Sequence, residues 1–402
     1  MNDDEANEER KPSGPLGGIR VLDLSAVLLG PVATQVLGDY GADVIKIEPP
    51  EGDVMRGNGV VQRPGMGSIF LAANRNKRSV VLDLKTGEGR AALRKLIATA
   101  DVFVHNMRVD AIERLGFGYE AVAAIKPQIV YCAAIGFGQD GPHRAKPAFD
   151  DIIQGACGLV DLNGCDSGTP TYMRTAIADK VTGLVLANAV MGALVYLARM
   201  GIGQYVEVPM LETMAAFTLT EHMGGLTFHG STAPAGYARM LEGRHPVPTQ
   251  DGWVCVLPYS PEQWKRLLTV RGRSDLADKY QLNTRAQLSA NRTALNGALD
   301  DIGRQMTNAE LMALCESLDI AAGEIFRLES VLDHPHLAAV GLFQDTEHPT
   351  EGRIREIRPP VRFSVTPATL RRHAPVLGQH TAEVLLEAGV ELPAQGKTEP
   401  VY

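Results

Sequence analysis

The residue best placed to do chemistry is an aspartate at the start of a long apolar segment. Asp179 ends the stretch Arg174-Thr-Ala-Ile-Ala-Asp179 and runs, through Lys180, into that segment. An aspartate at the start of a helix is usually an N-cap that accepts backbone N–H bonds. The same place suits a nucleophile, because the helix dipole and the amide hydrogens favour an ionised carboxylate, which can attack covalently. Both interpretations of Asp179 are open at this point.

Basic residues gather between positions 74 and 146 of an otherwise acidic chain. The 402 residues contain 39 Lys and Arg against 47 Asp and Glu, a net charge of −8. This balance is unfavourable for binding nucleic acid or an anionic membrane. The local excess of cations therefore indicates either a pocket for a phosphate-bearing ligand or a solvated positive face. Its members include Arg75, Lys77, Arg78, Lys85, Arg90, Arg108, Arg114, Arg144 and Lys146.

A glycine-rich string offers a competing interpretation. Gly136-Phe-Gly138-Gln-Asp-Gly141 matches the dinucleotide-binding pattern. That pattern needs a helix after its third glycine, whereas Pro142 and Pro147 make the following stretch extended or turn-like. Nicotinamide or flavin binding is therefore disfavoured.

The cysteines and histidines give no sign of a metal site. The cysteines are odd in number, widely spread and without zinc spacing, which indicates reduced, mostly buried thiols in a cytoplasmic protein. The acidic, polar stretch Met1–Arg10 is unlike a secretory signal. We expect no metal and no redox cofactor. The five cysteines are Cys132, Cys157, Cys165, Cys255 and Cys315.

The elements that must position these residues follow a βαβ pattern. Ile19–Leu24 predicts a strand, Gly30-Pro31 predicts a helix with proline at its first position, and Asp43–Glu48 predicts a returning strand. Such a unit implies a parallel sheet with a right-handed crossover. The first 200 or so residues are therefore expected to form an α/β domain. Further strands are predicted at Ser79–Leu84, Val102–Val104 and Ile129–Ala134, with a helix from about Thr86.

The segment Val181–Ala198 carries no charge over its 18 residues. Its length approaches the thickness of a bilayer. Two internal glycines, an asparagine and the adjoining Asp179 and Lys180 favour a core helix over a membrane span.

Composition changes along the chain predict the domain boundaries. We expect a disordered tail over 1–14, a large α/β domain over 15–228 and 340–402, and a small domain with linkers over 229–339. The small domain should contain a strand at Trp253–Leu257 and two helices that begin with capping boxes at Ser260 and Thr307. The returning segment should contain a strand-like Ile354–Phe363 and a closing helix, Thr381–Ala388, with Gly389 as its stop.

Eight segments match one enzyme family, in order, over nearly the whole chain. They are Gly17-Gly-Ile-Arg-Val-Leu-Asp-Leu24, Gly30-Pro31, Gly41-Ala-Asp-Val-Ile-Lys-Ile-Glu48, Asn76-Lys-Arg-Ser79 with Leu82-Asp83, Gly136-Phe-Gly138, Asp179-Lys-Val-Thr-Gly183, Gly203-Gln-Tyr-Val-Glu207 and Leu377-Gly-Gln-His-Thr381. Together they resemble the family III CoA-transferases, the group of formyl-CoA transferase and carnitine CoA-transferase. The resemblance implies a large doubly wound, Rossmann-like domain, a smaller α+β domain and an interlocked homodimer.

The resemblance also implies an activity and a nucleophile. Asp179 matches the family's catalytic aspartate, which attacks an acyl-CoA to give an acyl-aspartyl anhydride. The released CoA thiolate returns to form an aspartyl-CoA thioester, the acceptor carboxylate attacks that thioester, and CoA resolves the second anhydride. The implied partners are an acyl-CoA, a carboxylic acid and a second copy of the chain, with no cofactor beyond CoA.

The family's other site positions are carried over residue by residue. Asn106 and Arg114 match CoA contacts, Lys85 lies where the family wraps the nucleotide, and Lys146 is near a family lysine. Two further CoA ligands are supported by their charge alone. The loop after the first strand supplies part of the predicted substrate pocket. The two ligands are Arg108 and Arg75, and the pocket residues are Val27, Leu28 and Phe149.

Departures from the family pattern limit the substrates. Formyl-CoA transferase has His and Gln where this chain has Ala26 and Leu28, so a more apolar pocket is expected. Pro49 replaces an arginine that contacts the nucleotide, and the oligoglycine lid is missing. Two alternatives stay open: a 2-methylacyl-CoA racemase and a non-catalytic CoA-binding homologue. Racemases of this fold place a catalytic histidine where Phe149 stands, and phenylalanine cannot carry a proton.

Overall fold

The computed structural model describes residues 14–164, 168–237 and 244–390. The predicted tail, apart from Gly14, and Cys165 lie outside the described residues. The chain divides into two compact units. Unit 1 contains the described residues up to Val160, then Tyr172–Phe217, and the chain from Leu337 onward. Unit 2 contains Asp161–Thr171 and Thr218–His336.

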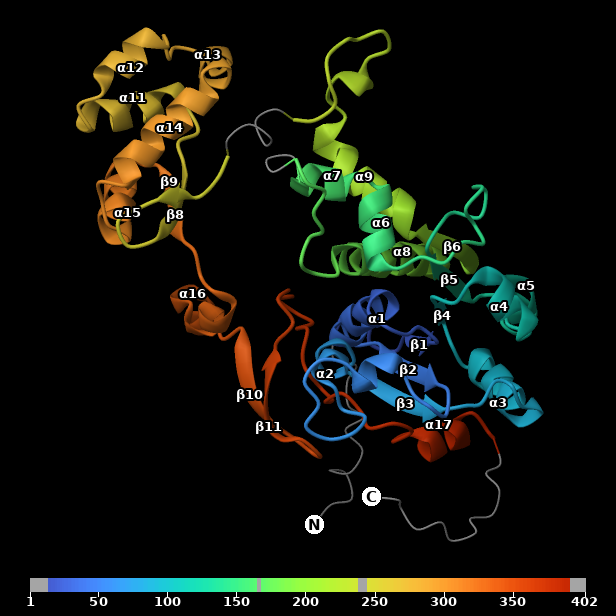
Figure 1. Ribbon diagram of the computed structural model, residues 1–402. Coiled ribbons are helices and arrows are strands. Elements are labelled where there is room, and N and C mark those ends of the chain that lie inside the picture. The colour runs from blue at the N-terminus through green and yellow to red at the C-terminus, as the bar shows by residue number, and fades with distance from the viewer. Residues whose placement is uncertain (1–13, 165–167, 238–243, 391–402) are drawn as a thin grey trace. The chain divides into compact units, whose positions relative to one another are not determined.

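Unit 1 is built on a six-stranded sheet in the order β3-β2-β1-β4-β5-β6 (Figure 1). All neighbouring strands are parallel, so their C-terminal ends lie along one edge. The strand order reverses between β1 and β4, and ligands bind at this switch point in doubly wound sheets. The predicted α/β class is confirmed. The strands are β1 (Arg20–Asp23), β2 (Asp43–Glu48), β3 (Lys77–Val81), β4 (Val102–His105), β5 (Val130–Ile135) and β6 (Gln204–Pro209).

Helices cover both faces of this sheet. Successive residues of a strand point to opposite faces of the sheet, and here both faces are apolar, as expected for parallel strands buried on two sides. Val21 and Val44 belong to the hydrophobic core on one face, and Leu22 and Ile45 belong to the core on the other face. Elements of the first core include α1 (Leu29–Asp39), α6 (Asp150–Ala156), α8 (Ile177–Met200) and α9 (Met210–His222). Those of the second are α3 (Gly87–Ala98), α4 (Val109–Arg114), α5 (Tyr119–Ile125) and α17 (Thr381–Glu387).

The long apolar helix α8 packs within unit 1, against α1, β5 and β6. Among the described helices it alone has the length and composition that could cross a membrane. Residues on one side of it, including Gly183 and Leu186, are buried in the first core. Gly183 permits the close approach of α1, because a Cβ there would lie 2.6 Å from the carbonyl oxygen of Leu29. These contacts are those of a core helix.

The C-terminal segment covers the outer edge of β3. The Ser79 N–H donates to His380 Nδ1 at 3.2 Å, and the His380 N–H donates back to the Ser79 oxygen at 2.9 Å. The Val81 N–H donates to Thr381 Oγ1 at 3.0 Å. Arg78 of β3 forms ion pairs with two glutamates of α17. The last helix is therefore tied to the edge strand by backbone and side-chain bonds.

Unit 2 contains a small antiparallel sheet in the order β7-β8-β9, with helices packed on it. The capping boxes predicted at Ser260 and Thr307 are confirmed, and β8 has its predicted bounds. Its elements are β7 (Val247–Pro248), β8 (Trp253–Leu257), α11 (Pro261–Val270), α12 (Ser274–Lys279), α13 (Arg285–Ala290), α14 (Arg292–Gly303), α15 (Asn308–Ser317) and β9 (Ala321–Glu324).

Three local predictions need correction. Pro31 is the third residue of α1, not the first. The third strand begins at Lys77 and ends at Val81. The strand predicted to reach Phe363 is β11 (Gly352–Ile357), paired with β10 (Phe343–His348), and it ends before two prolines that cannot donate to a ladder. The remaining elements are η2 (Val54–Gly57), α2 (Ser68–Ala73), α7 (Leu159–Gly164), η3 (Gly224–Thr227), η4 (Leu328–Asp333) and α16 (Pro335–Ala339).

Candidate active site

Asp179 lies in the first turn of α8 but does not cap it. The N-cap residue is Ala176, and no side chain makes a capping bond there. The N-cap interpretation is therefore wrong for Asp179. Its own N–H group donates to Asp150 Oδ1 at 3.0 Å, so a neighbouring helix satisfies this amide. The Asp179 carboxylate is left available for chemistry.

Asp150 is held in place by a buried glutamine. It is the first residue of α6, and its Oδ2 accepts a hydrogen bond from Gln154 Nε2 at 2.6 Å. Gln154 is fully buried, and its Oε1 accepts from the Met173 N–H at 2.9 Å. The segment before α8 is thereby joined to α6. Sequence reasoning missed Asp150, although it directly follows Phe149, which was singled out.

The two carboxylates face each other without a cation. Burial, and then the charge of Asp150, raise the pKa of Asp179 to about 6. Within the described residues, neither Asp150 nor Asp179 forms an ion pair. The helix start was expected to favour the ionised form of Asp179, but desolvation and like charge outweigh it and raise the pKa. At pH 7 most molecules still carry the ionised, nucleophilic form.

The helix that carries Asp179 packs against α1, which follows the loop after β1. Residues four apart lie on one side of a helix, so Asp179 shares a side with Gly183, which contacts the start of α1. The loop just before α1 contains two predicted pocket residues, Val27 and Leu28, and both are half-buried. The third, Phe149, is 69% exposed and adjoins Asp150.

Asn106 bridges the switch point of the sheet. It follows β4, and its side chain reaches the loop after β1. Its Nδ2 donates to the Ala26 oxygen at 2.7 Å, and its Oδ1 accepts from the Ala26 N–H at 3.0 Å. Predicted to bind CoA, Asn106 instead makes both of these bonds to the loop backbone in the structure.

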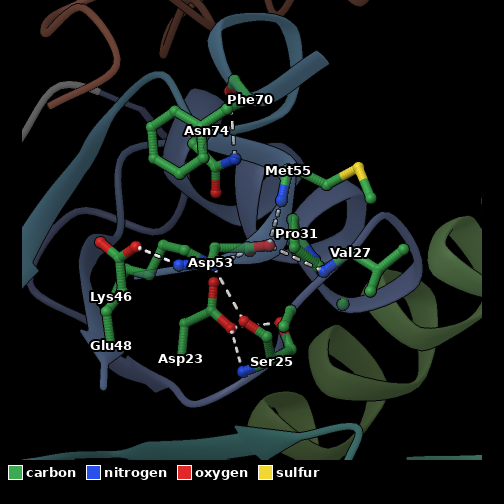
Figure 2. Close-up of polar contacts among 12 residues, drawn as sticks. Asp23, Ser25, Val27, Pro31, Lys46, Glu48, Asp53, Met55, Phe70 and Asn74 are labelled. Atoms are coloured by element: carbon green, nitrogen blue, oxygen red, sulfur yellow. Dashed lines mark hydrogen bonds and ion pairs between the residues drawn. The ribbon is translucent and has the colours of Figure 1, made fainter. Parts of the chain in front are cut away.

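Buried ion pairs surround the same loop, and Figure 2 labels four of their members, Asp23, Lys46, Glu48 and Asp53. Lys46 Nζ lies 2.9 Å from Asp53 Oδ2, and Arg56 lies 2.7 Å from Glu48. Lys77 Nζ lies 3.1 Å from Asp23 Oδ2. Each of these six side chains is almost wholly buried, and each charge has an opposite partner. Sequence reasoning assigned no role to Asp53 or Lys46.

A cavity of about 220 Å³ opens at the C-terminal ends of β1, β2 and β3. Lys85 lines it, and Met107 and Leu115 in its wall adjoin the predicted ligands Arg108 and Arg114. Lys85, Arg108 and Arg114 are exposed and form no ion pair with any described residue. The other lining residues are Leu24, Ile47, Glu48, Pro49, Pro50, Glu51, Leu82, Asp83 and Leu84.

The last two predicted CoA ligands lie apart from this cavity. Lys146 is exposed in the loop between β5 and α6. Arg75 is buried, and its guanidinium pairs with Asp39 at 2.6 Å and donates to the Ile357 oxygen at 2.6 Å. The donors of Arg75 are therefore engaged in the internal packing of unit 1.

The glycine string after β5 holds protein carboxylates. The Gly138 N–H donates to Glu212 Oε1 at 2.9 Å, and the Gln139 N–H donates to Glu207 Oε1 at 3.0 Å. Between β5 and α6 the described chain forms no helix, as Pro142 and Pro147 predicted.

The cysteines of the described chain are free thiols, and most of them are buried. Cys132, Cys157 and Cys315 are buried and free, whereas Cys255 is exposed and free. Burial raises the pKa of the Cys315 thiol to about 11. No group of three or more metal-ligating side chains occurs among the residues the structure covers.

These features define a doubly wound α/β protein with polar and charged side chains gathered near the switch point of its sheet. The chain belongs to the family described as CoA-transferase family III, whose sequence pattern matches residues 16–381. It is accordingly a CoA-transferase by family, as the resemblance implied.

Similar proteins agree with this assignment. A succinate–glutarate CoA-transferase from Agrobacterium fabrum is 35% identical over 94% of this chain and 96% of its own. A human succinyl-CoA:glutarate CoA-transferase is 31% identical over 93% of this chain and 86% of its own. The crystal structure of a CAIB/BAIF family protein from Brucella suis has a TM-score of 0.80 and 32% identity, covering 94% of this chain and 100% of that one.

Proposed function

We propose that this CoA-transferase moves CoA between an acyl-CoA and a carboxylate through covalent intermediates on Asp179. The observation that carries the proposal is the Asp179 carboxylate itself, which is half-buried, has no cation partner among the described residues, and lies one helical turn before Gly183, the residue that contacts the start of α1. A carboxylate that were merely structural would be expected to have a cation or a cap to bond.

The chemistry proceeds in four balanced steps. The Asp179 carboxylate attacks the thioester carbonyl, forming an acyl-aspartyl anhydride and releasing CoA thiolate. The thiolate attacks the aspartyl carbonyl, forming aspartyl-CoA and releasing the donor acid. The acceptor carboxylate attacks aspartyl-CoA, giving a second anhydride and the thiolate again. The thiolate then attacks the acceptor carbonyl, which yields the new acyl-CoA and restores Asp179.

The CoA would occupy the cavity at the ends of β1, β2 and β3. Lys85, Arg108 and Arg114 suit its phosphates, because exposed cations without ion pairs can bind an anion without breaking an existing bond. Lys146 joins this set as a fourth candidate. No metal or redox group is part of the proposed reaction.

The first substrates to test follow from the relatives' names. Two relatives are named for succinate or succinyl-CoA with glutarate, and a third, from Haloarcula hispanica, for succinyl-CoA with mesaconate. The apolar residues Val27, Leu28 and Phe149 favour acceptors with a hydrocarbon portion. A panel of these acids and of longer monocarboxylates would identify the pair.

The decisive experiment traps the intermediate. Wild-type protein is incubated with acyl-CoA and then with hydroxylamine, which converts the anhydride or the thioester into an aspartyl hydroxamate. Peptide mapping should place the hydroxamate at Asp179, and Asp179→Ala should give none. A hydroxamate on another residue, or transfer by Asp179→Ala, would refute the proposal.

We also propose the interlocked homodimer that the family resemblance implies. One side of α8 supports it: Leu184 and Val195, about three turns apart, are both more than half exposed, and Val185 and Tyr196 adjoin them. Tagged and untagged protein should form no hybrid over days, because interlocked chains exchange only after unfolding. Ready exchange, or a monomer in sizing experiments, would reject this assembly.

A further inference from the structure

Val27 has a backbone conformation that its side chain disfavours. Its φ is 70°, in the left-handed region. A β-branched residue adopts this region at a cost, whereas glycine adopts it freely. Such strain persists only where the surrounding structure enforces it, and it is concentrated at functional sites.

Three side chains enforce the conformation by bonding consecutive residues of the loop, and Figure 2 labels two of them, Lys46 and Asp53. Lys46 Nζ donates to the Ser25 oxygen at 2.9 Å. Asn106 makes its two bonds to Ala26. The Val27 N–H donates to Asp53 Oδ1 at 3.3 Å. Lys46 lies in β2, Asn106 follows β4 and Asp53 lies in the segment after β2, so three separate parts of the chain bond the loop.

The central anchor, Asp53, is itself fixed. It is 3% exposed, and its Oδ1 also accepts from the Met55 N–H at 3.0 Å. Its backbone N–H donates to Glu48 Oε2 at 3.0 Å, and its Oδ2 pairs with Lys46. Asp53, which bonds Val27, and Lys46, which bonds Ser25, are therefore the two members of one buried ion pair.

A simple connection between β1 and α1 would not need this arrangement, because glycine at position 27 would make the same turn without strain. What the strained residue adds is an apolar side chain, held on the loop that leads into α1, and the start of α1 contacts Gly183, one turn after Asp179. The anhydride and the aspartyl thioester on Asp179 are both open to hydrolysis. A fixed apolar wall beside them excludes water, and excluding water suppresses this side reaction.

We infer that Asp53 is a positioning residue, which with Lys46 and Asn106 holds Val27 in its left-handed conformation so that the loop shields the intermediates on Asp179 from water. The inference rests on the proposed function. The hydrolysed product would be the free acid, with water supplying the hydroxyl group and CoA leaving as the thiol.

The test is a double-mutant cycle between Asp53→Ala and Val27→Gly. Asp53→Asn is the matched control, since it keeps an oxygen for the Val27 N–H but loses the charge. Each variant is assayed for transfer, for acyl-CoA hydrolysis without acceptor, and for thermal unfolding. Asn106→Ala replaces Asp53→Ala in the cycle if the latter does not fold.

The expected results separate positioning from stability. Asp53→Ala should raise the ratio of hydrolysis to transfer about 10-fold, whereas Asp53→Asn should change it less than about 3-fold while unfolding at a lower temperature. With glycine at position 27 the turn needs no anchor. Asp53→Ala should therefore lower the unfolding temperature less in that background than in the wild type.

Two results would overturn the inference. One is equal loss of thermal stability in both backgrounds, which would mean that Asp53 does not hold the strained turn. The other is an unchanged ratio of hydrolysis to transfer in Asp53→Ala, which would make the anchor purely structural. If the wild type transfers CoA between no pair tested, the proposed function fails first, and the unfolding cycle still decides whether Asp53 holds Val27.

Discussion

Two sets of buried carboxylates in unit 1 differ in how their charge is balanced. Burial tends to raise the pKa of Asp23, but Lys77, Lys46 and two hydroxyl groups lower it to about 2. In Glu48 burial is likewise outweighed, chiefly by Arg56, and the pKa is lowered. Asp179 meets burial and a second carboxylate instead, and its pKa rises to about 6.

This difference separates carboxylates that have a cation partner from one that has none in the described chain. A neutralised carboxylate holds its neighbours in place but is a poor nucleophile, because its lone pairs are bonded. A carboxylate without a cation costs stability, and proteins retain such groups where chemistry needs them. The two sets are connected, because Asp53 and Lys46 of the neutralised network hold the loop that leads into α1, and the start of α1 contacts Gly183, one turn after Asp179.

The largest expected effect is on activity at the unbalanced site. Asp179→Asn should lower transfer by a factor of about 10⁴ or more, because no covalent intermediate can form. Initial rates of CoA exchange measure it. Asp151→Asn, an exposed change in the first turn of α6, is the control and should leave the rate nearly unchanged. A similar loss of transfer rate in Asp179→Asn and Asp151→Asn would contradict a special role for Asp179.

The next effect is on stability at the balanced site. Arg56→Ala leaves Glu48 buried without its cation and should lower the free energy of unfolding by about 3–5 kcal/mol. Arg355→Ala removes an exposed partner of Asp345 and should cost less than about 1 kcal/mol. Urea unfolding of both variants checks this, and similar losses would show that burial does not matter here.

Removing the unbalanced charge should stabilise the protein. The folded pKa of Asp179, about 6, lies above its unfolded value of 3.8, so the ionised form is costly in the folded state. Asp179→Asn should therefore raise the free energy of unfolding by about 1–3 kcal/mol at pH 7. The gain should shrink as pH falls through 6 and vanish near 4. A gain that is the same at pH 7 and pH 4.5 would exclude the charge as its cause.

A smaller effect concerns the pH profile. The rate of acyl-enzyme formation should fall as pH drops through about 6, because Asp179 becomes protonated. Asp150→Asn keeps an oxygen for the Asp179 N–H but removes the like charge, so the fall should move about 0.5–1 pH unit lower. The shift is limited because burial is the larger cause. If the pH dependence of acyl-enzyme formation is the same in Asp150→Asn and wild type, the charge of Asp150 does not raise the pKa of Asp179.

The smallest expected effect compares two arginines. Arg114 is exposed and unpaired within the described chain, unlike Arg56, and should matter for CoA rather than for stability. Arg114→Ala should raise the acyl-CoA KM several-fold with little change in kcat or melting temperature, because a phosphate contact contributes equally to ground and transition states. An unchanged KM would favour a solvated arginine at the end of α4.

Hydrophobic patterning predicted most of unit 1, and capping signals predicted two helices of unit 2, because parallel strands and capped helices have strong local signals. Asp43–Glu48 and the boxes at Ser260 and Thr307 depend on residues a few positions apart, and these predictions held. The weak strands β10 and β11 are half exposed and lack a continuous apolar run. One of them was missed and the other misplaced.

The site was less predictable because its contacts join distant parts of the chain. Asp179 was found from its position before an apolar helix, together with the family resemblance. Its pKa could not be found, since Asp150 is 29 residues away. Asn106 reaches Ala26 across 80 residues, and the basic run at Arg75 pairs with Asp39. Nothing local marks such partners.

The cover on β3 has a consequence for biosynthesis. An uncovered edge strand can pair with any other extended chain. The bonds that close this edge come from His380 and Thr381, some 300 residues after Ser79 and Val81. During translation, β3 therefore emerges long before its cover is made. A nascent chain or a product truncated before His380 should depend on chaperones to avoid aggregation, whereas the finished chain protects itself.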